Sequence, residues 1–307
     1  MKEIVSLPPL EAHERMFLMA AADLDASALL YKRRHYPQAV FFLQQAVEKA
    51  TKSFGMQFVG ITEQEARSAK FIGHKSGRVF EHACTRIGNV VEEINDAVAT
   101  APEMQFFAPL VTPSLSQIAT TIHEIALGFQ TTDAELDAHR DLSLAELKER
   151  IQQIDELEAE LQEVGKEPAD VESRDTAFTA EEVASLKNEV HTLLDSLYAH
   201  MPDHRQEAEK NLESLIDLLN DPNYLQKVIR VMCDFIGAAS GFISLSTIMQ
   251  PHAIRSRYPS GDFDPLEFYT RERPLVRTLP ALYRIACRSM DRLYNLSAAV
   301  PPQGEEE

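Results

Sequence analysis

Residues 23–54 read DLDASALLYKRRHYPQAVFFLQQAVEKATKSF, and this stretch decides the fold. On the N-terminal side of His35, apolar residues recur every three to four positions, as on one face of a helix; they are Phe17, Ala20, Leu24, Ala28 and Tyr31. After His35 the same spacing returns, with Val40, Leu43, Val47, Ala50 and Phe54. Pro37 suits the first turn of this second helix. Because few residues separate the two helices, the sequence predicts an antiparallel helical hairpin.

The rest of the chain predicts further helices and no strand. Apolar residues at helical spacing cover residues 77–99, 114–130, 224–249 and 275–296, whereas no stretch alternates in the two-residue period of a strand. We therefore expect an all-α protein, built as an antiparallel up-down helical bundle. The last seven residues, 301–307, are rich in proline and glutamate and predict a flexible acidic tail.

Composition limits the class of protein. The chain has 307 residues, of which 44% are hydrophobic and 25% charged, so it is neither wholly disordered nor collagen-like. No apolar run reaches the roughly 18 residues of a membrane helix, and the N-terminus lacks the features of a signal peptide. We therefore expect a cytoplasmic protein that does not associate with a membrane.

No metal or cofactor site is predicted. The three cysteines are far apart and form no CxxC pair; they are Cys84, Cys233 and Cys287. His200 and His204 have the spacing of a helical metal pair, but Pro202 interrupts the turn that they would need. The glycine-rich fingerprints of dinucleotide and nucleoside triphosphate sites are also absent from the sequence.

Charge is strongly segregated along the chain. Residues 133–221 hold 25 acidic and 8 basic residues, which accounts for nearly all of the net charge of −18. Residues 223–304 hold 10 basic residues, nine of them arginine, and 6 acidic ones. An acidic protein is a poor general binder of nucleic acid. Arginine suits phosphate recognition, so a local basic site stays possible, although surface ion pairs explain most of these arginines.

The acidic segment predicts a coiled coil. Ser143 with Glu146, and Thr179 with Glu182, have the spacing of capping boxes, and each pair precedes leucine-rich heptads. Two such helices joined by a polar turn predict an antiparallel coiled-coil helical hairpin over about residues 141–200. Pairing of the two helices with each other explains this pattern, and docking of a partner is the alternative.

The N-terminal hairpin resembles the opening helices of HEPN domains. The matching positions are Asp23, Leu24, Ala26, His35, Tyr36, Ala39, Gln44, Gln45, Ala46, Glu48, Lys49, Ala50 and Lys52. Two later elements fit in order, namely Gly73-His74-Lys75 and Ser256-Arg257-Tyr258-Pro259. The resemblance covers about residues 11–100 and 222–298. It implies a HEPN-like bundle of residues 1–100 and 222–300, interrupted by an acidic helical insertion at 101–221 that contains the coiled-coil hairpin.

The resemblance to HEPN domains implies two kinds of function. One is a module that senses a nucleotide or RNA, or that binds another protein, and that forms a homodimer. Such a module could belong to a toxin-antitoxin or defence system. Its coiled-coil arm could contact a nucleotidyltransferase or another protein. The other is a metal-independent ribonuclease that uses an arginine and a histidine. In such an enzyme histidine transfers the proton of a ribose hydroxyl and arginine stabilises the phosphate. Arg67 and His74, with six residues between them, are the candidate catalytic pair, although His74 could instead cap or pack a helix.

A second set of candidate residues lies in the loop PHAIRSRYP. We expect it to bind a nucleotide or another anion beside His74, since arginine forks match phosphate oxygens; its members are His252, Arg255, Arg257 and Tyr258. The structural alternative is that Arg257 and Tyr258 only anchor the loop.

Overall fold

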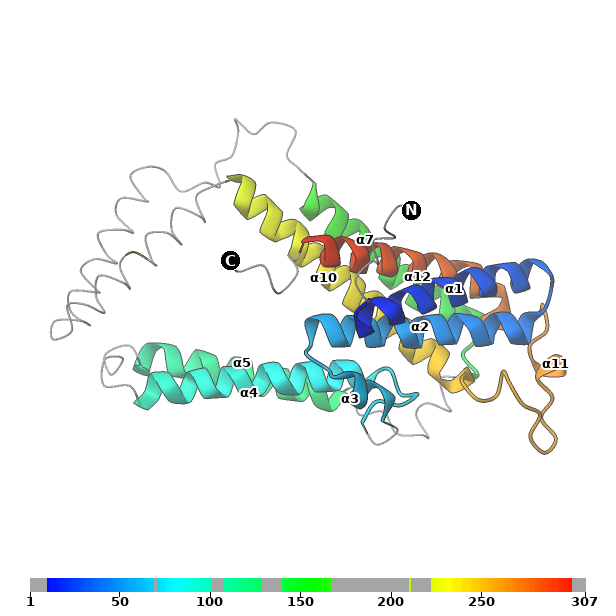
Figure 1. Ribbon diagram of the computed structural model, residues 1–307, viewed down its shortest axis with the longest axis horizontal. Coiled ribbons are helices and arrows are strands. Elements are labelled where there is room, and N and C mark those ends of the chain that lie inside the picture. The colour runs from blue at the N-terminus through cyan, green and yellow to red at the C-terminus, as the bar shows by residue number, and fades with distance from the viewer. Residues whose placement is uncertain are drawn as a thin grey trace, which may run out of the picture. The chain divides into compact units, whose positions relative to one another are not determined.

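The computed structural model describes residues 10–68, 71–100, 108–128, 140–166, 210 and 222–299. Every regular element in these ranges is a helix (Figure 1), and the β-type pairing described among them is an isolated bridge between Ser260 and Phe263. The elements are α1 (Ala12–Lys32), α2 (Tyr36–Phe58), α3 (Glu63–Arg67), α4 (Arg78–Thr100), α5 (Ala108–Gly128), α7 (Leu144–Gly165), α10 (Pro222–Met249), the 3-10 turn η3 (Gln250–His252), α11 (Pro265–Phe268) and α12 (Pro274–Ala299). The all-α fold class is confirmed.

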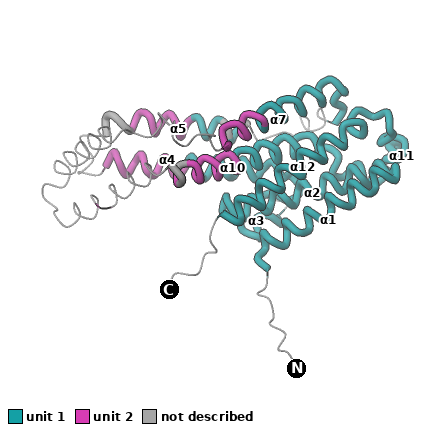
Figure 2. Tube along the Cα trace, turned by 90° about the horizontal axis from the view of Figure 1, so that it is seen from above, with its two compact units in different colours: residues 1–88, 121–158, 235–307 teal, residues 89–120, 159–234 magenta. Residues whose placement is uncertain are grey.

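Internal contacts divide the chain into two compact units (Figure 2). The first unit comprises residues 1–88, 121–158 and 235–307, and the second comprises residues 89–120 and 159–234. The sequence predicts a bundle of residues 1–100 and 222–300 with an insertion at 101–221. Residues 121–158 of that insertion fall in the first unit, and residues 89–100 and 222–234 of that bundle fall in the second. The second helix of the expected coiled coil and the acidic tail lie outside the described residues.

The predicted hairpin is formed by α1 and α2 of the first unit. The chain reverses at Arg34, whose φ of 64° is left-handed, and the His35 amide donates to the Leu30 carbonyl at 2.9 Å. The rings of Tyr31 and Tyr36 meet across this turn with centroids 5.7 Å apart. The buried face of α2 follows the predicted spacing, because Val40, Leu43, Val47, Ala50 and Phe54 are each at most 2% exposed.

The core of the first unit forms where this hairpin packs against α12 and the second half of α10. In Figure 1, α1, α2 and α12 lie side by side. Buried apolar residues of α10 and α12 recur at helical spacing; they include Phe242, Leu245, Met249, Leu282, Ile285 and Leu293. The buried aromatic ring of Phe54 lies at the centre of this core, within 6.2 Å of the Phe242 ring. Aliphatic and aromatic burial of this kind supplies most of the stabilisation of a helical bundle.

The first half of α7 also belongs to the first unit. The predicted capping box at its start is observed, since the Glu146 amide donates to Ser143 Oγ at 3.2 Å. Leu147 is 1% exposed, and Asp155 and Glu158 form ion pairs with Arg288 and Arg292 of α12. This part of the predicted arm therefore contacts the bundle, because its acidic residues meet the arginines of the C-terminal segment.

The second half of α10 is a core helix. The span Gln226–His252, which takes in most of α10 and η3, is long and apolar enough to cross a membrane by length and composition alone, with a mean hydropathy of 1.6. Lys227, Arg230 and Asp234 interrupt this span, so it is not an uninterrupted apolar run. Within the first unit its inward residues are at most 1% exposed; they are Ala238, Phe242, Leu245, Ile248 and Met249. Burial against other helices gives a folded domain the same apolar pattern.

The second unit contains the end of α4 (residues 89–100), the start of α5 (108–120), the end of α7 (159–165) and the start of α10 (222–234). Asn95 Nδ2 donates to Ser116 Oγ at 3.1 Å and links α4 to α5. Gln226 Nε2 donates to the carbonyls of Gly165 and Lys166, both at 3.2 Å. These bonds satisfy carbonyl groups that the end of α7 leaves without helical partners.

Candidate functional site

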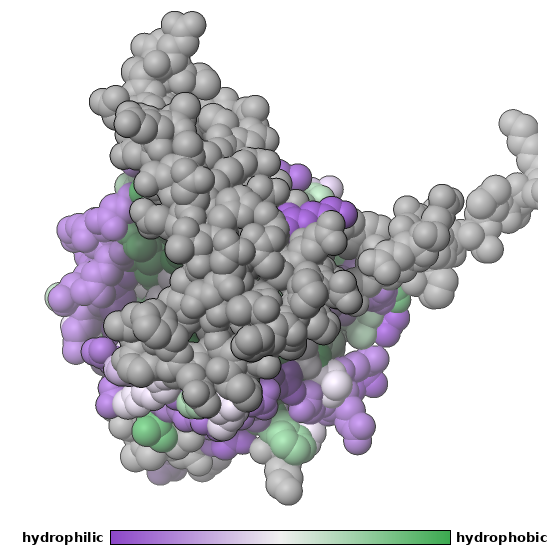
Figure 3. All heavy atoms as spheres, turned by 90° about the vertical axis from the view of Figure 1, so that its left-hand side faces the viewer, coloured by the Kyte–Doolittle hydropathy of each residue, from purple (hydrophilic) through white to green (hydrophobic). Residues whose placement is uncertain are grey.

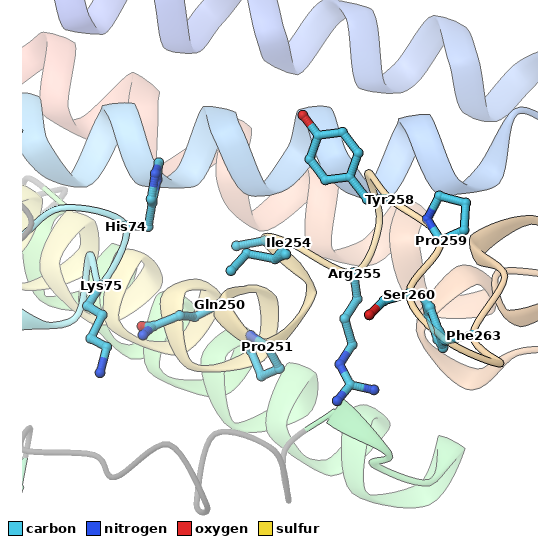
Figure 4. A pocket seen from close by; sticks show the side chains of 11 residues that line it. His74, Lys75, Gln250, Pro251, Ile254, Arg255, Tyr258, Pro259, Ser260 and Phe263 are labelled. Carbon is cyan, nitrogen blue, oxygen red and sulfur yellow. The ribbon is translucent and has the colours of Figure 1, made fainter.

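The candidate site is a hollow of about 610 Å³ in the first unit (Figure 4). Its wall comes from two segments far apart in sequence, the turn before α4 and residues 250–263. The lining residues are His74, Lys75, Gln250, Pro251, Ala253, Ile254, Arg255, Tyr258, Pro259, Ser260 and Phe263. On the face shown in Figure 3, the described surface is mainly hydrophilic with small hydrophobic patches, which are ordinary on proteins. Concavity, rather than surface hydropathy, singles out this site.

Buried Ile72 fixes the turn that carries His74 to the core. Ile72 is 1% exposed and packs in a small cluster with Ile61, Ala66 and Val79. Gly73 adopts a left-handed φ of 51°, which a residue without Cβ reaches at little cost. The Lys75 amide then donates to the Ile72 carbonyl at 2.8 Å. The turn therefore holds His74 and Lys75 in fixed positions on the wall of the hollow.

His74 is a surface histidine with a buried carboxylate behind it. Its side chain is 69% exposed, and its Nδ1 lies 3.2 Å from both carboxylate oxygens of Glu48. Glu48 is 6% exposed and also receives Lys52 Nζ at 2.8 Å and Gln44 Nε2 at 3.1 Å. Burial raises the pKa of Glu48, but Lys52, Gln44 and His74 outweigh it and leave that pKa below 4.5. Glu48 is therefore ionised at neutral pH and orients the imidazole.

His252 lies in the protein interior instead of on the wall of the hollow. Its side chain is 1% exposed, and its Nδ1 lies 2.8 Å from the Tyr269 hydroxyl. Ser256 Oγ donates to the His252 carbonyl at 2.7 Å and closes the turn. Burial lowers the pKa of His252 from 6.5 to about 3 and raises the pKa of Tyr269. His252 is therefore neutral and holds the loop to the core, so it is placed to support the site and not to touch an anion.

Lowering the pH from 7 to 5 is expected to destabilise the protein by about 2 kcal/mol through His252. A histidine in the unfolded chain gains its proton as the pH falls below 6.5, whereas folded His252 stays neutral until about pH 3. The stabilisation present above pH 6.5 is thus lost progressively toward pH 3. Urea unfolding at both pH values measures it. His252→Gln should flatten the pH dependence by a similar amount, and an unchanged pH dependence would contradict the assignment.

The three remaining residues of the predicted anion set lie in different surroundings. Arg255 lines the hollow and places its guanidinium 5.6 Å from the centroid of the Phe263 ring. Tyr258 lines the hollow and is 63% exposed. Arg257 does not line it, and its guanidinium stacks 4.2 Å from the centroid of the Phe41 ring on α2. The alternative that Arg257 anchors the loop agrees with this stacking.

Arg67 and His74 do not lie on the same wall. Arg67, at the end of α3, is 68% exposed, and its Nη2 lies 2.5 Å from Glu63 Oε1 one turn earlier. It is not among the residues that line the hollow. Sequence spacing brought the two residues together in the prediction, but a short helix and a separate turn carry them.

Two side chains at the candidate site were not among the residues predicted from the sequence. Lys75 lines the hollow, and Glu48 orients His74. Both residues belonged to the motifs that suggested the family resemblance, so the signal was present in the sequence. Their roles depend on which residues face each other in the folded chain, which the motifs alone do not give. In Figure 4, Lys75 and Arg255 extend to one side of the hollow, and His74 and Tyr258 extend to the other.

Within the described ranges, no group of three or more histidine, cysteine, aspartate or glutamate side chains is placed to hold a metal ion. The hollow itself offers nitrogen donors of one histidine, a lysine and an arginine, together with aromatic and aliphatic surface. Cationic and aromatic groups of this kind suit an anionic ligand with a flat ring.

Comparison with known families agrees with the hairpin. The HEPN domain matches residues 13–64, which comprise nearly all of α1, the whole of α2 and the start of α3. No curated protein and no solved structure gives a significant match. The match confirms the resemblance to HEPN domains over these elements.

Proposed function

We propose that this protein is a nucleotide- or RNA-sensing module and that the hollow is its binding site. The HEPN match supports a nucleotide- or RNA-related role in general. The observation that carries the proposal is the joint placement of His74, Lys75, Arg255 and Tyr258 around one concave surface, although about 180 residues separate the two segments. Lysine and arginine attract phosphate, and an exposed tyrosine ring offers a stacking surface for a base.

The cellular location, the oligomeric state and the partner are proposed from the resemblance to HEPN domains. The proposal places the protein in the cytoplasm, as a homodimer, within a toxin-antitoxin or defence system. A nucleotidyltransferase or another protein is the proposed partner of the acidic segment, whose described part is α7. Static light scattering measures the stoichiometry, and a monomer at micromolar concentration would contradict the proposed dimer.

Arg255→Ala and Lys75→Ala are each expected to weaken nucleotide binding about tenfold, because each removes a charged donor from the hollow. Isothermal titration of AMP and of a short single-stranded RNA in low salt measures the change. Arg257→Ala is the matched control, since Arg257 lies on the same loop but stacks on Phe41 outside the hollow. It should change affinity less than twofold. Equal losses for Arg255→Ala and Arg257→Ala would contradict the placement of the site.

The alternative function is a metal-independent ribonuclease. The observation that favours it is the contact between exposed His74 and ionised Glu48, since a carboxylate that orients an imidazole prepares it for proton transfer. Arg67 is paired with Glu63, so Lys75 or Arg255 would replace it as the group beside the phosphate. Cleavage of RNA in the presence of a chelator, lost in His74→Ala while binding persists, would establish the enzyme. Binding without cleavage by the wild-type protein would leave the sensing function.

A further inference from the structure

The turn between α1 and α2 carries three positive charges in a row. Lys32, Arg33 and Arg34 are all exposed, and residues 26–47 contain no acidic residue. Among the described residues, Arg34 is the non-glycine residue with a left-handed φ, 64°. Asparagine or glycine adopts this conformation at lower cost. An arginine at a position that suits a smaller residue favours a role for its charge.

The start of α12 brings a further arginine to the same end of the first unit. Phe17 of α1 stacks on Tyr294 of α12 with ring centroids 6.4 Å apart. Asp25, eight residues later on α1, lies within electrostatic reach of Tyr283, eleven residues earlier on α12. α1 and α12 are therefore antiparallel, and the same register brings the end of α1 level with Arg277, because both helices rise about 1.5 Å per residue. In Figure 1 the turn after α1 and the start of α12 lie at the same end.

Four exposed basic side chains thus form one surface, named here the basic end; they are Lys32, Arg33, Arg34 and Arg277. Within the part of the chain that the structure describes, none of the four forms an ion pair or a side-chain hydrogen bond. Arg273, Arg288 and Arg292 of the same C-terminal segment pair instead with carboxylates of residues 141–158. The basic end therefore keeps charge that the acidic residues described in the first unit do not pair.

The chemistry of the basic end fits the phosphates of an RNA strand. Three of its four members are arginine, whose planar fork matches phosphate oxygens. The rings of Tyr31 and Tyr36 meet at the same turn, and aromatic rings among cations offer a stacking surface for unpaired bases. Segments that bind membranes add bulky apolar side chains to their cations. Residues 32–38 contain no leucine, isoleucine or phenylalanine, so RNA is favoured over a membrane surface.

We propose that the basic end is a second phosphate-binding surface, which holds the backbone of an RNA strand while one nucleotide of that strand occupies the hollow. Both surfaces belong to the first unit, and α2 connects them. Arg257, next to Tyr258 of the hollow, stacks on Phe41, and Phe41 lies five residues, or about 8 Å, after Tyr36 along α2. The inference rests on the proposed function of the hollow. It selects an RNA strand over a free mononucleotide as the ligand.

The test compares AMP with a single-stranded RNA of about 12 nucleotides, titrated into the full-length protein at about 0.1 M salt. The variant is Arg33→Gln with Arg34→Asn, because asparagine tolerates the left-handed φ at position 34. RNA affinity is expected to fall about tenfold, and AMP affinity should be unchanged. The slope of log affinity against log salt should also become shallower by about 1.4, since each lost phosphate contact on a single strand contributes about 0.7. Arg277→Gln alone should reduce the slope by about 0.7.

Arg15→Gln with Arg67→Gln is the matched control. It changes the net charge by the same amount, but both arginines pair with Glu63. Arg15 lies about 25 Å from Lys32 along α1, which exceeds the screening length of about 10 Å at this salt concentration. RNA affinity should therefore change less than about twofold. Thermal melting followed by circular dichroism verifies the fold of each variant. Equal RNA losses in the two double variants would overturn the proposal, because net charge alone would then explain them.

The failure of this inference is distinguishable from failure of the proposed function. RNA affinity that falls in Lys75→Ala but not in Arg33→Gln with Arg34→Asn would remove the basic end and leave the hollow. RNA binding that depends on the basic end, with no AMP binding and no effect of Lys75→Ala, would support the basic end as an RNA surface and remove the hollow as a nucleotide site. Binding of phosphatidylserine vesicles in place of RNA, lost in the same double variant, would overturn the proposal and assign the surface to a membrane.

Discussion

Phe54→Ala is expected to lower the free energy of unfolding by about 3–5 kcal/mol, which is the usual cost of truncating a buried phenylalanine. Phe54 is 1% exposed, and four other phenylalanine rings lie with centroids 5.2 to 6.2 Å from its own; they are Phe58, Phe80, Phe235 and Phe242. The substitution removes the ring that joins α2 to α4 and α10, and close-packed neighbours cannot fill the space. Urea unfolding followed by circular dichroism measures the loss.

Leu18→Ala provides the control for this experiment. Leu18 lies on α1 of the same hairpin but is 54% exposed, so its truncation should change stability by less than about 0.5 kcal/mol. A loss below about 1 kcal/mol for Phe54→Ala, or equal losses for the two variants, would show that the core of the first unit is not centred on Phe54.

The hairpin that contains Phe54 could be predicted because local signals agree there. The three- to four-residue spacing marks the buried face, Pro37 marks the start of the second helix, and the short connection leaves only an antiparallel arrangement. The observed bounds of α1 and α2 follow these signals closely. Helix existence depends on residues near in sequence, which a single chain displays directly.

The element against which a helix packs cannot be read from the sequence of that helix alone. The heptads of α7 indicate an apolar face, but they do not name the element that covers it. Segregated charge suggested that the acidic segment stands apart from the arginine-rich C-terminal segment. Opposite charges attract, however, and Asp155 and Glu158 pair with Arg288 and Arg292. The first half of α7 therefore contacts α12 through the acidic residues from which a separate arm was predicted.

The candidate site shows the same limit. The sequence placed His74 and Arg255 near each other, and both line the hollow. It also placed His252 there, but His252 points into the core because Tyr269, 17 residues later, bonds to its ring. Ala253, Ile254 and Arg255 line the hollow in succession, whereas His252 and Arg257 do not, and no periodic pattern in the sequence reveals this. Loop residues were therefore predicted as a set, whereas the structure separates them.

Glu158→Gln is expected to destabilise the protein by about 3 kcal/mol, because it removes a carboxylate charge that lies beside a mostly buried guanidinium. Arg292 Nη2 lies 2.8 Å from Glu158 Oε1, and the two side chains are only 11% and 13% exposed. Gly237 of α10 lies against this arginine, since a Cβ there would come within 2.5 Å of Arg292 Nε. Water therefore has little access to replace the lost carboxylate. Urea unfolding of the variant measures the cost.

The double variant Glu158→Gln with Arg292→Met separates the charge from the packing. Methionine removes the buried charge and is flexible enough to fill the space along Gly237, so the double variant should recover most of the stability lost in Glu158→Gln. A double variant as unstable as the sum of the two single changes would mean that the pair is not coupled. Recovery would instead show that α7 is held to α12 mainly by the need of a buried arginine for a carboxylate. The acidic segment would then be required for the stability of the arginine-rich helix that it contacts.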